Sequence, residues 1–287
     1  MNAPPPPRSR VWTCVSQVPV SAWIGIVILA FWVVLAVIPS LLAGHREADV
    51  LTNESFAAPG VAGLLGGDYL GRDLLSRLVY AARRTLGLAV LITVLAFAAG
   101  VFFGFLVAAS RRWIGLLLNS INDVLLAFPS LILALIVIAA LGTSLPVLIL
   151  TVAMIEATRV FRVARALGMD IVAMDYVEAA RARGEGAWWI MLREVLPNAI
   201  PPLAAEFGVR FTYSILFISA LGFLGLGVQP PDADWGVMVR ENLQGLLFGS
   251  IAPLVPAAAI ASVTIAVNLL VDAQLRRTTS DVAYGLA

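Results

Sequence analysis

Long apolar runs separated by short polar segments constrain this chain more than any other feature of its sequence. Trp23–Leu42 is almost wholly apolar, and Leu86–Ala109 forms a second such run. About 20 residues of α-helix, at 1.5 Å per residue, cross the roughly 30 Å hydrocarbon core of a bilayer, where backbone amides and carbonyls have to bond within their own segment. The sequence therefore predicts an all-α membrane protein.

The composition excludes several other classes of protein. Only 13% of the residues are charged, compared with about 25% in soluble domains. A formal charge of +1 provides no basic surface for nucleic acid. The chain has a single cysteine, Cys14, and a single histidine, His45, so neither a disulfide framework nor a zinc cluster can form within it. We expect no metal, no cofactor and no nucleic-acid partner.

Six transmembrane helices are predicted, with both termini in the cytoplasm. Besides the two runs above, the expected spans are Leu125–Leu141, Leu145–Ile155 continuing through Glu156, Ala204–Gly227 and Ile251–Val271. Pro129 should kink the third span, because proline interrupts helical hydrogen bonding. Gly100 and Gly104 are four residues apart, a spacing that lets another helix approach the second span closely. Arginines gather in the segments that this topology places in the cytoplasm, as the positive-inside rule requires.

The spans divide the chain into five regions. These are a proline-rich cytoplasmic tail (residues 1–20), the first transmembrane helix (21–43), an extracytoplasmic segment (44–84), a five-helix core (85–273) and a C-terminal cytoplasmic tail (274–287). A cleaved signal peptide is the alternative for the first helix, since Arg8 and Arg10 precede it. Its apolar run is longer than the roughly 7–15 residues of a signal core, so we expect an uncleaved span.

Charged residues inside the spans need partners, because an isolated charge is costly in hydrocarbon. Glu156 lies three residues before Arg159, and Glu206 lies four residues before Arg210. Each acid is therefore predicted to pair with the arginine on its own helix. Asp123 is predicted to lie at shallow depth in a structural capping or pairing role.

The remaining arginines are predicted to lie near the membrane surfaces. In the extracytoplasmic segment they run against the positive-inside rule, and Asp73 with Arg77 is expected to form a solvated pair one helical turn apart. Three arginines at helical spacing are predicted to anchor the cytoplasmic end of the fourth span to phospholipid, or alternatively to touch an ATPase: Arg159, Arg162 and Arg165.

The longest polar interruption is Tyr176–Asn198, which is predicted to form two short helices joined by a hinge. Alanines and arginines favour the first helix, and Gly184 penalises its continuation. The second helix, Ala187–Leu196, should stop at Pro197, which lacks the amide hydrogen that a helix interior needs.

This interruption resembles the EAA loop of the inner-membrane subunits of bacterial ATP-driven importers. The matching positions are Glu178, Ala179, Ala180, Gly184, Leu196 and Pro197. Other blocks resemble dipeptide and oligopeptide permeases in the same order along the chain: Asp68–Arg83 (DYLGRDLLSRLVYAAR), Asp123–Leu133, and Leu221–Trp235 (LGFLGLGVQPPDADW). Together they cover roughly residues 66 to 272, and their combination is specific to that permease family.

The resemblance implies a type I ABC importer permease fold in a bacterial inner membrane. In that family the EAA loop forms a cytoplasmic coupling helix, here expected to contact the ATPase through Tyr176, Glu178, Ala179, Ala180, Gly184, Leu196 and Pro197. The implied partners are a second, homologous permease, two ABC ATPase subunits that bind ATP and Mg²⁺, and an extracytoplasmic substrate-binding protein. The chain itself is expected to be non-catalytic.

Two other functions stay open at this point. The chain has no lysine, so it cannot contain a phosphate-binding loop ending in Gly-Lys-Ser or Gly-Lys-Thr, and energy has to come from another chain or from an ion gradient. An ion-coupled carrier acting alone is one alternative, and a non-transporting membrane scaffold or sensor is another. Family members carry dipeptides, oligopeptides, glutathione or nickel chelates, and the sequence does not choose among them or identify substrate-binding residues.

Overall fold

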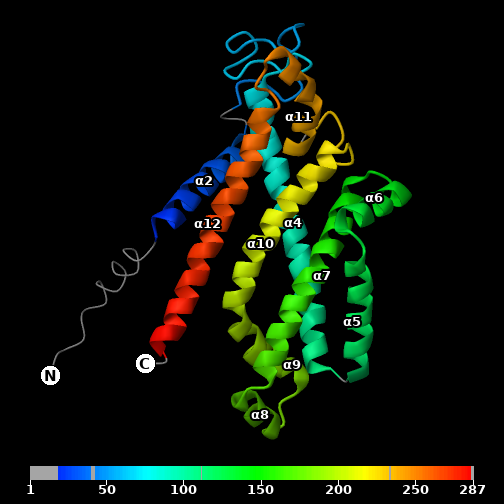
Figure 1. Cartoon of the computed structure of the whole chain (residues 1–287), viewed down its shortest axis with the longest axis vertical. Helices are drawn as coiled ribbons and strands as arrows, with labels where there is room; N and C mark the ends of the chain where they lie inside the picture. The colour runs from blue at the N-terminus through cyan, green and yellow to red at the C-terminus, as the bar shows by residue number, and fades with distance from the viewer. Residues whose placement is uncertain (1–18, 40–42, 111, 233, 286–287) are drawn as a thin grey trace, which may run out of the picture.

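The computed structural model of the chain describes residues 19–39, 43–110, 112–232 and 234–285. These residues are mainly helical and form an elongated bundle, with irregular loops at its upper end and two short helices at its lower end (Figure 1). The predicted all-α architecture is confirmed. Most of the predicted N-terminal tail, including Cys14, lies outside the described residues.

The elements follow one another as a series of helices with few long connections. In chain order they are α2 (Val20–Val37), α4 (Leu74–Ala109), α5 (Arg112–Ala127), α6 (Ser130–Leu141), α7 (Leu145–Val172), α8 (Asp175–Ala182), α9 (Ala187–Ile190), the π turn η1 (Met191–Val195), α10 (Leu196–Phe223), α11 (Trp235–Asn242), the 3-10 turn η2 (Leu243–Phe248) and α12 (Leu254–Gly285).

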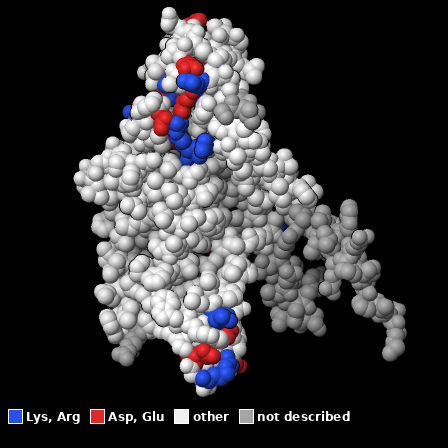
Figure 2. All heavy atoms as spheres, turned by 180° about the vertical axis from the view of Figure 1, so that it is seen from behind, with Lys and Arg blue, Asp and Glu red and all other residues white. Residues whose placement is uncertain are grey.

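Several helices are long and apolar enough to cross a membrane. Among the described residues these are α2, α4, the continuous helical run 187–223 and residues 254–276 of α12, and the bent pair α5–α6 adds a fifth if it counts as one span. The six predicted spans are reached only if α7, which carries several charges, is included. On the face shown in Figure 2, charged side chains gather at the upper and lower ends and leave the middle almost without them.

Helices α4 and α7 pack closely through the two glycines that the sequence singled out. A Cβ atom on Gly100 would lie 2.6 Å from Val160 Cβ, and one on Gly104 would lie 2.8 Å from Ala164 Cβ. Real carbon atoms do not approach so closely, so only glycine permits this separation of the two helices. The prediction of a close helix approach is confirmed, and the partner helix is α7.

Helix α2 packs on α12 and on α4. Gly25 lies against the backbone of Ala266, where an added Cβ would be 2.7 Å from the carbonyl oxygen. The indole N–H of Trp32 donates to Ser262 Oγ at 2.8 Å, and the same ring meets Trp235 edge-on at 4.8 Å between centroids. These contacts integrate the first helix into the bundle.

The third predicted span is broken at its proline. Helices α5 and α6 meet at a 92° bend, and Pro129 lies between them as the N-cap residue of α6. The residue preceding a proline is pushed away from helical geometry, which explains why α5 ends shortly before it. The predicted kink is confirmed, although the break is sharp enough to make α5–α6 either a broken span or a re-entrant pair.

A buried ion-pair network, which we call the upper network, holds the irregular loop onto the bundle. Asp68 is fully buried and accepts from Arg72 Nε at 2.7 Å and from Arg77 Nη1 at 2.7 Å. Arg77 also lies 2.9 Å from Glu241 Oε2, which is on α11. The network therefore joins the loop, α4 and α11.

The upper network corrects the predicted pairing of Asp73 with Arg77. Asp73 instead caps the N-terminus of α4, since its Oδ1 accepts from Leu75 N at 3.1 Å, and the Arg77 side chain is only 1% exposed rather than solvated. The helix begins at Leu74, twelve residues before the predicted start of the second span at Leu86. Sequence spacing on one helix could not show the acid supplied by α11.

The upper network and the contacts of Arg84 pair three of the arginines that run against the positive-inside rule. Arg72 and Arg77 are neutralised by the acids described above. Arg84 contacts both Glu47 and Asp232. Three arginines of this end are thus held in ion pairs, whereas Arg83 is exposed.

Replacing Gly104 by alanine tests the contact between α4 and α7. We expect Gly104→Ala to lose about 1–3 kcal/mol of stability, because the added methyl group forces the helices apart. Gly87→Ala is the matched control on the same helix, since a Cβ there meets nothing within 4 Å. Thermal unfolding in detergent should separate the two variants, and an equal change in both would contradict the packing argument.

Replacing Arg77 by methionine tests the upper network. Removal of one partner leaves Asp68 and Glu241 with a single shared arginine, and breaking a buried pair costs about 3–5 kcal/mol. Limited proteolysis should therefore cut residues 43–73 faster in Arg77→Met than in the wild type. Arg83→Gln, at an exposed position of the same helix, should leave the cleavage rate unchanged.

Candidate functional site

The polar interruption of the sequence forms α8 at the lower end of the bundle (Figure 1). Val177 and Ala180 are fully buried. Val177 belongs to an apolar cluster, here called the lower cluster, that includes Phe105 of α4, Ile171 of α7 and Val195 of η1. Apolar side chains on one face thus fix α8 to α4, α7 and η1.

The opposite face of α8 is open to the surroundings. The side chains of Tyr176, Glu178 and Ala179 are exposed, as are the arginines at 181 and 183. A short helix of eight residues has little stability of its own. Its exposed residues are therefore held in position mainly by the lower cluster.

Gly184 ends α8 through a Schellman motif. Its φ angle is +89°, its amide donates to Arg181 O at 2.9 Å, and the amide of Glu185 donates to Ala180 O at 3.2 Å. A Cβ atom on Gly184 would meet nothing within 4 Å. The left-handed backbone, rather than lack of space, is what favours glycine here.

The predicted stop at Pro197 is wrong. Helix α9 continues through η1 into α10, which runs to Phe223 with Pro197 in its first turn. In η1 the amide of Leu196 bonds to Met191 O, five residues back. A π turn of this kind shifts the hydrogen-bond register just where Pro197 cannot donate, and proline is tolerated in the first turn of a helix.

The fifth span also ends earlier than predicted. Instead of reaching Gly227, α10 stops at Phe223, because Gly225 adopts a φ angle of +84°. The amide of Leu226 then bonds to Leu221 O at 2.8 Å. Glycine in the left-handed region closes the helix by the same motif as Gly184.

The structure brings the seven predicted coupling residues together at the lower end but gives them different environments. Tyr176, Glu178, Ala179 and Gly184 lie on or directly after α8 and are exposed. Ala180, also on α8, is buried. Leu196 and Pro197 lie at the start of α10. Leu196 is half-buried against the lower cluster. Pro197 is exposed as well, so five of the seven residues, all but Ala180 and Leu196, lie where another protein could contact them.

A second polar site, here called the central network, joins α7 to α10. Glu156 is fully buried and accepts from Arg159 Nη1 at 2.6 Å and from Arg210 Nη1 at 3.1 Å. Arg210 Nε in turn lies 2.7 Å from Glu206 Oε1. The two predicted pairs are confirmed. The contact between Glu156 and Arg210, which links them across two helices, was not predicted.

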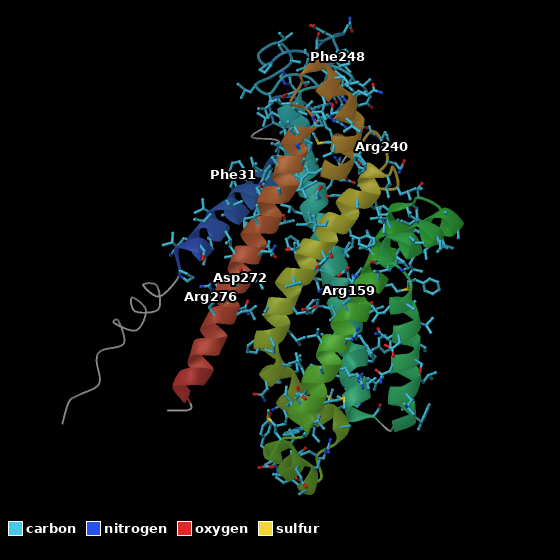
Figure 3. The ribbon with its side chains drawn as sticks, in the orientation of Figure 1. Phe31, Arg159, Arg240, Phe248, Asp272 and Arg276 are labelled. Atoms are coloured by element: carbon cyan, nitrogen blue, oxygen red, sulfur yellow. The ribbon has the colours of Figure 1, made fainter. Side chains whose placement is uncertain are left out.

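The central network holds Arg159 within the bundle rather than at the end of its helix. Arg159 lies in the middle part of the molecule, well below Phe248 and at about the height of Asp272 and Arg276 of α12 (Figure 3). Thirteen residues of α7 follow it, to Val172. These contacts do not support the predicted anchoring role of Arg159, because its guanidinium bonds to Glu156 and Ser130; the anchoring role of Arg162 and Arg165 stays a prediction.

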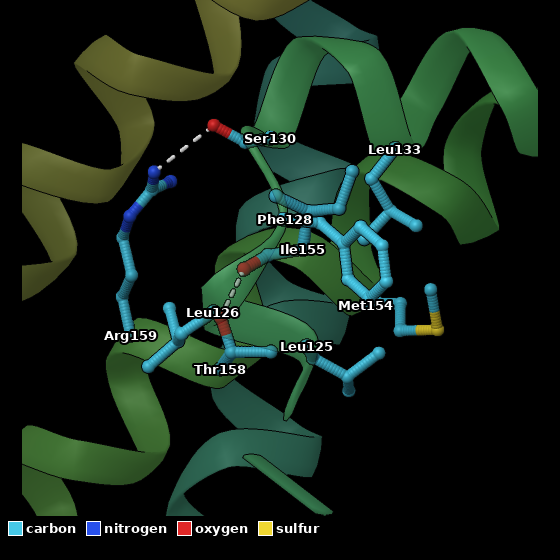
Figure 4. A pocket seen from close by; sticks show the side chains of 9 residues that line it. All are labelled: Leu125, Leu126, Phe128, Ser130, Leu133, Met154, Ile155, Thr158 and Arg159. Carbon is cyan, nitrogen blue, oxygen red and sulfur yellow. Dashed lines mark hydrogen bonds between the residues drawn. The ribbon is translucent and has the colours of Figure 1, made fainter. Parts of the chain in front are cut away.

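Arg159 also reaches the start of α6. Its Nη2 donates to Ser130 Oγ at 3.2 Å, beside a hollow of about 30 Å³ that Phe128, Met154 and Thr158 help to line (Figure 4). The break at Pro129 is what brings Ser130 to this position. Asp123, by contrast, is exposed and forms no ion pair with another described residue, so the structure does not provide its predicted partner.

Comparison with known proteins identifies the family. A family model described as "Binding-protein-dependent transport system inner membrane component" matches residues 100–282. The dipeptide transport system permease protein DppC of Alkalihalophilus pseudofirmus is 30% identical over 251 residues, which cover 88% of this chain and 83% of that protein. The chain belongs to the binding-protein-dependent transport family of inner-membrane components.

Other relatives of the chain are named after different substrates. The di/tripeptide transport system permease protein DppC of Pseudomonas aeruginosa is 37% identical over 224 residues, covering 78% of this chain and 74% of that one. The glutathione transport system permease protein GsiD of Pectobacterium atrosepticum is 31% identical over 247 residues, covering 86% of this chain and 80% of that one. Membership in the binding-protein-dependent transport family argues against an isolated carrier or a scaffold.

A solved structure supports the fold of this family member. The chain superposes on an amino acid ABC transporter, solved with histidines, with a TM-score of 0.54 and 21% sequence identity over 70% of this chain and 93% of the other. Both α8 and the central network lie within the stretch matched by the family model.

Substituting Gly184 tests the backbone constraint at the end of α8. A β-branched residue in the left-handed region costs about 1–2 kcal/mol, so Gly184→Val should speed hydrogen exchange of the Glu185 amide about 5- to 30-fold. Gly184→Asn is the control, because asparagine tolerates this conformation. Exchange rates measured by mass spectrometry should differ between the variants, and identical rates would show that the turn does not need a positive φ.

Proposed function

We propose that this chain is a permease subunit of an ATP-driven importer of peptides or similar small solutes, coupled through α8 to separate ATPase subunits. Family membership and the peptide and glutathione permeases among its relatives support the substrate class. The observation that carries the coupling role is the division of α8 into a buried face, with Val177 and Ala180, and an exposed face, with Tyr176, Glu178 and Ala179.

The lower cluster makes α8 suitable for transmitting a movement. Val177, Ile171 and Ala199 pack together from α8, α7 and α10, and interiors packed at this density transmit displacement rather than absorb it. A push on the exposed face of α8 would therefore tilt α7 and α10. These helices meet at the central network, so the force reaches the middle of the bundle.

The proposed topology has six crossings, with α8 in the cytoplasm and the upper loops on the extracytoplasmic side. Helix α7 supplies the sixth span: its 28 residues are long enough at about 1.5 Å per residue, and its buried Glu156 is paired. The arginines exposed around α8, at 181, 183 and 193, favour a cytoplasmic lower end. The chain is then a multi-pass inner-membrane protein with both termini in the cytoplasm.

The proposal assigns no covalent chemistry to this chain. ATP and Mg²⁺ would be bound by two partner ATPases, and substrate would be delivered by an extracytoplasmic binding protein. A second, homologous permease would complete the translocation pathway. The absence of lysine is consistent with nucleotide hydrolysis elsewhere, because a phosphate-binding loop requires that residue.

Crosslinking tests the contact between α8 and the ATPases. In a Cys14→Ser background co-expressed with its partner subunits, we expect Ala179→Cys, carrying a thiol-linked photocrosslinker, to capture an ATPase subunit. Leu64→Cys is the control, because this residue is 78% exposed but lies in the upper loop. Immunoblots of membranes illuminated with and without ATP provide the measurement.

The crosslinking result also decides the orientation. Capture of an ATPase at position 64 and not at 179 would reverse the proposed topology. Capture at neither position, in membranes where the complex co-purifies, would remove α8 from the coupling interface.

A further inference from the structure

The central network is neutral as a whole but uneven in its exposure. Glu156 and Glu206 balance Arg159 and Arg210, and Glu156 is shared by both arginines. The side chain of Arg210 is 11% exposed, whereas that of Arg159 is 33% exposed. Arg159 is therefore the end of the network that opens to the surroundings, and Glu156 neutralises only part of its charge.

The guanidinium of Arg159 has hydrogen-bond donors that the network does not use. Nη1 donates to Glu156 and Nη2 donates to Ser130, and each of these nitrogens carries two hydrogens. One hydrogen on each nitrogen, with the Nε–H, is left for another acceptor. Two N–H groups of a planar guanidinium match the two oxygens of a carboxylate.

An aromatic ring lies beside this cation. The Tyr213 ring is 6.0 Å from Arg159 Cζ and 4.8 Å from Arg210 Cζ, and its side chain is 48% exposed. In the proposed topology α7 crosses the bilayer, and an exposed arginine midway along a span is too costly to face hydrocarbon. The face formed by Arg159 and Tyr213 must therefore border water or protein, as the wall of a passage between subunits would.

We infer that Arg159 binds a carboxylate group of the transported solute during its passage along α7 and α10. This inference rests on the proposed function and adds to it a substrate-contacting residue and a required chemical group. Glu156 weakens the positive field of Arg159 without abolishing it, which suits a site that has to release its ligand. Tyr213 provides an apolar surface for the rest of the solute.

The alternative role for Arg159 is structural, as a counter-charge for buried Glu156, and a double variant separates the two. Glu156→Gln/Arg159→Gln removes one negative and one positive charge, so the remaining Glu206 and Arg210 stay balanced. The network then needs no counter-charge, but the carboxylate-binding group is gone. Arg159→Lys keeps the positive charge, and Ser130→Ala removes only one hydrogen bond to the guanidinium.

The test uses the complete complex of this chain with its partner permease, ATPases and binding protein, reconstituted in liposomes. Uptake of tritiated Ala–Ala and Ala–Ala–Ala is measured together with the rate of ATP hydrolysis without peptide and the melting temperature. We expect the double variant to lose at least tenfold in uptake while hydrolysis stays within twofold of the wild type and the melting temperature is unchanged. Arg159→Lys and Ser130→Ala should each keep at least a third of the uptake.

The outcomes separate this inference from the proposed function. Uptake by the double variant within twofold of the wild type would show that Arg159 only balances Glu156, and would overturn the inference alone. The inference is also overturned if the double variant loses uptake together with a lower melting temperature and Arg159→Lys loses uptake too. A wild-type complex that assembles but imports neither peptide would overturn the proposed substrate class itself.

Discussion

The structure depends above all on keeping charge neutral where water is scarce. An unpaired charge or backbone group in hydrocarbon costs several kcal/mol, more than most single contacts return. The helices provide hydrogen-bond partners for the backbone amides and carbonyls, and the two ion-pair networks provide counter-charges for the buried charged side chains. In each network one buried acid, Asp68 or Glu156, accepts from two arginines, and a further acid completes the balance.

The two networks have different mechanical consequences. The upper network joins α4 to α11 and to the loop that precedes α4, so it fixes the upper part of the molecule. The central network joins α7 to α10 and reaches α6 through Ser130, so it crosses the region that would move if α8 were displaced. A movement that separates α7 from α10 would have to break or rearrange the contact between Glu156 and Arg210.

Glycine serves two separate purposes in this arrangement. Gly100 and Gly104 allow α4 and α7 to approach within distances that a methyl group would prevent, which makes this pair a rigid unit. Gly184 and Gly225 instead supply left-handed backbone at the ends of α8 and α10. The first pair determines how close the helices lie, and the second determines where they stop.

Much of the fold was predictable because its causes are local. Hydropathy indicated membrane helices, Pro129 indicated the break between α5 and α6, and the spacing of Glu156 from Arg159 indicated their pair. The errors arose where the decisive contact was distant or where helix geometry could adapt. Asp73 does not pair with Arg77, because α11 brings Glu241 to that arginine, and Pro197 does not end its helix, because a π turn precedes it.

The sequence by itself determined that this chain is a membrane protein of apolar helices, that one polar segment interrupts them, and that this segment matches an importer permease family. Periodicity and hydropathy carry that information along a single stretch of chain. Only the tertiary structure decided that two ion pairs on different helices join into one central network, with Arg159 at its exposed end. Such a contact depends on the relative positions of residues 54 apart in the chain, which packing fixes and local sequence does not.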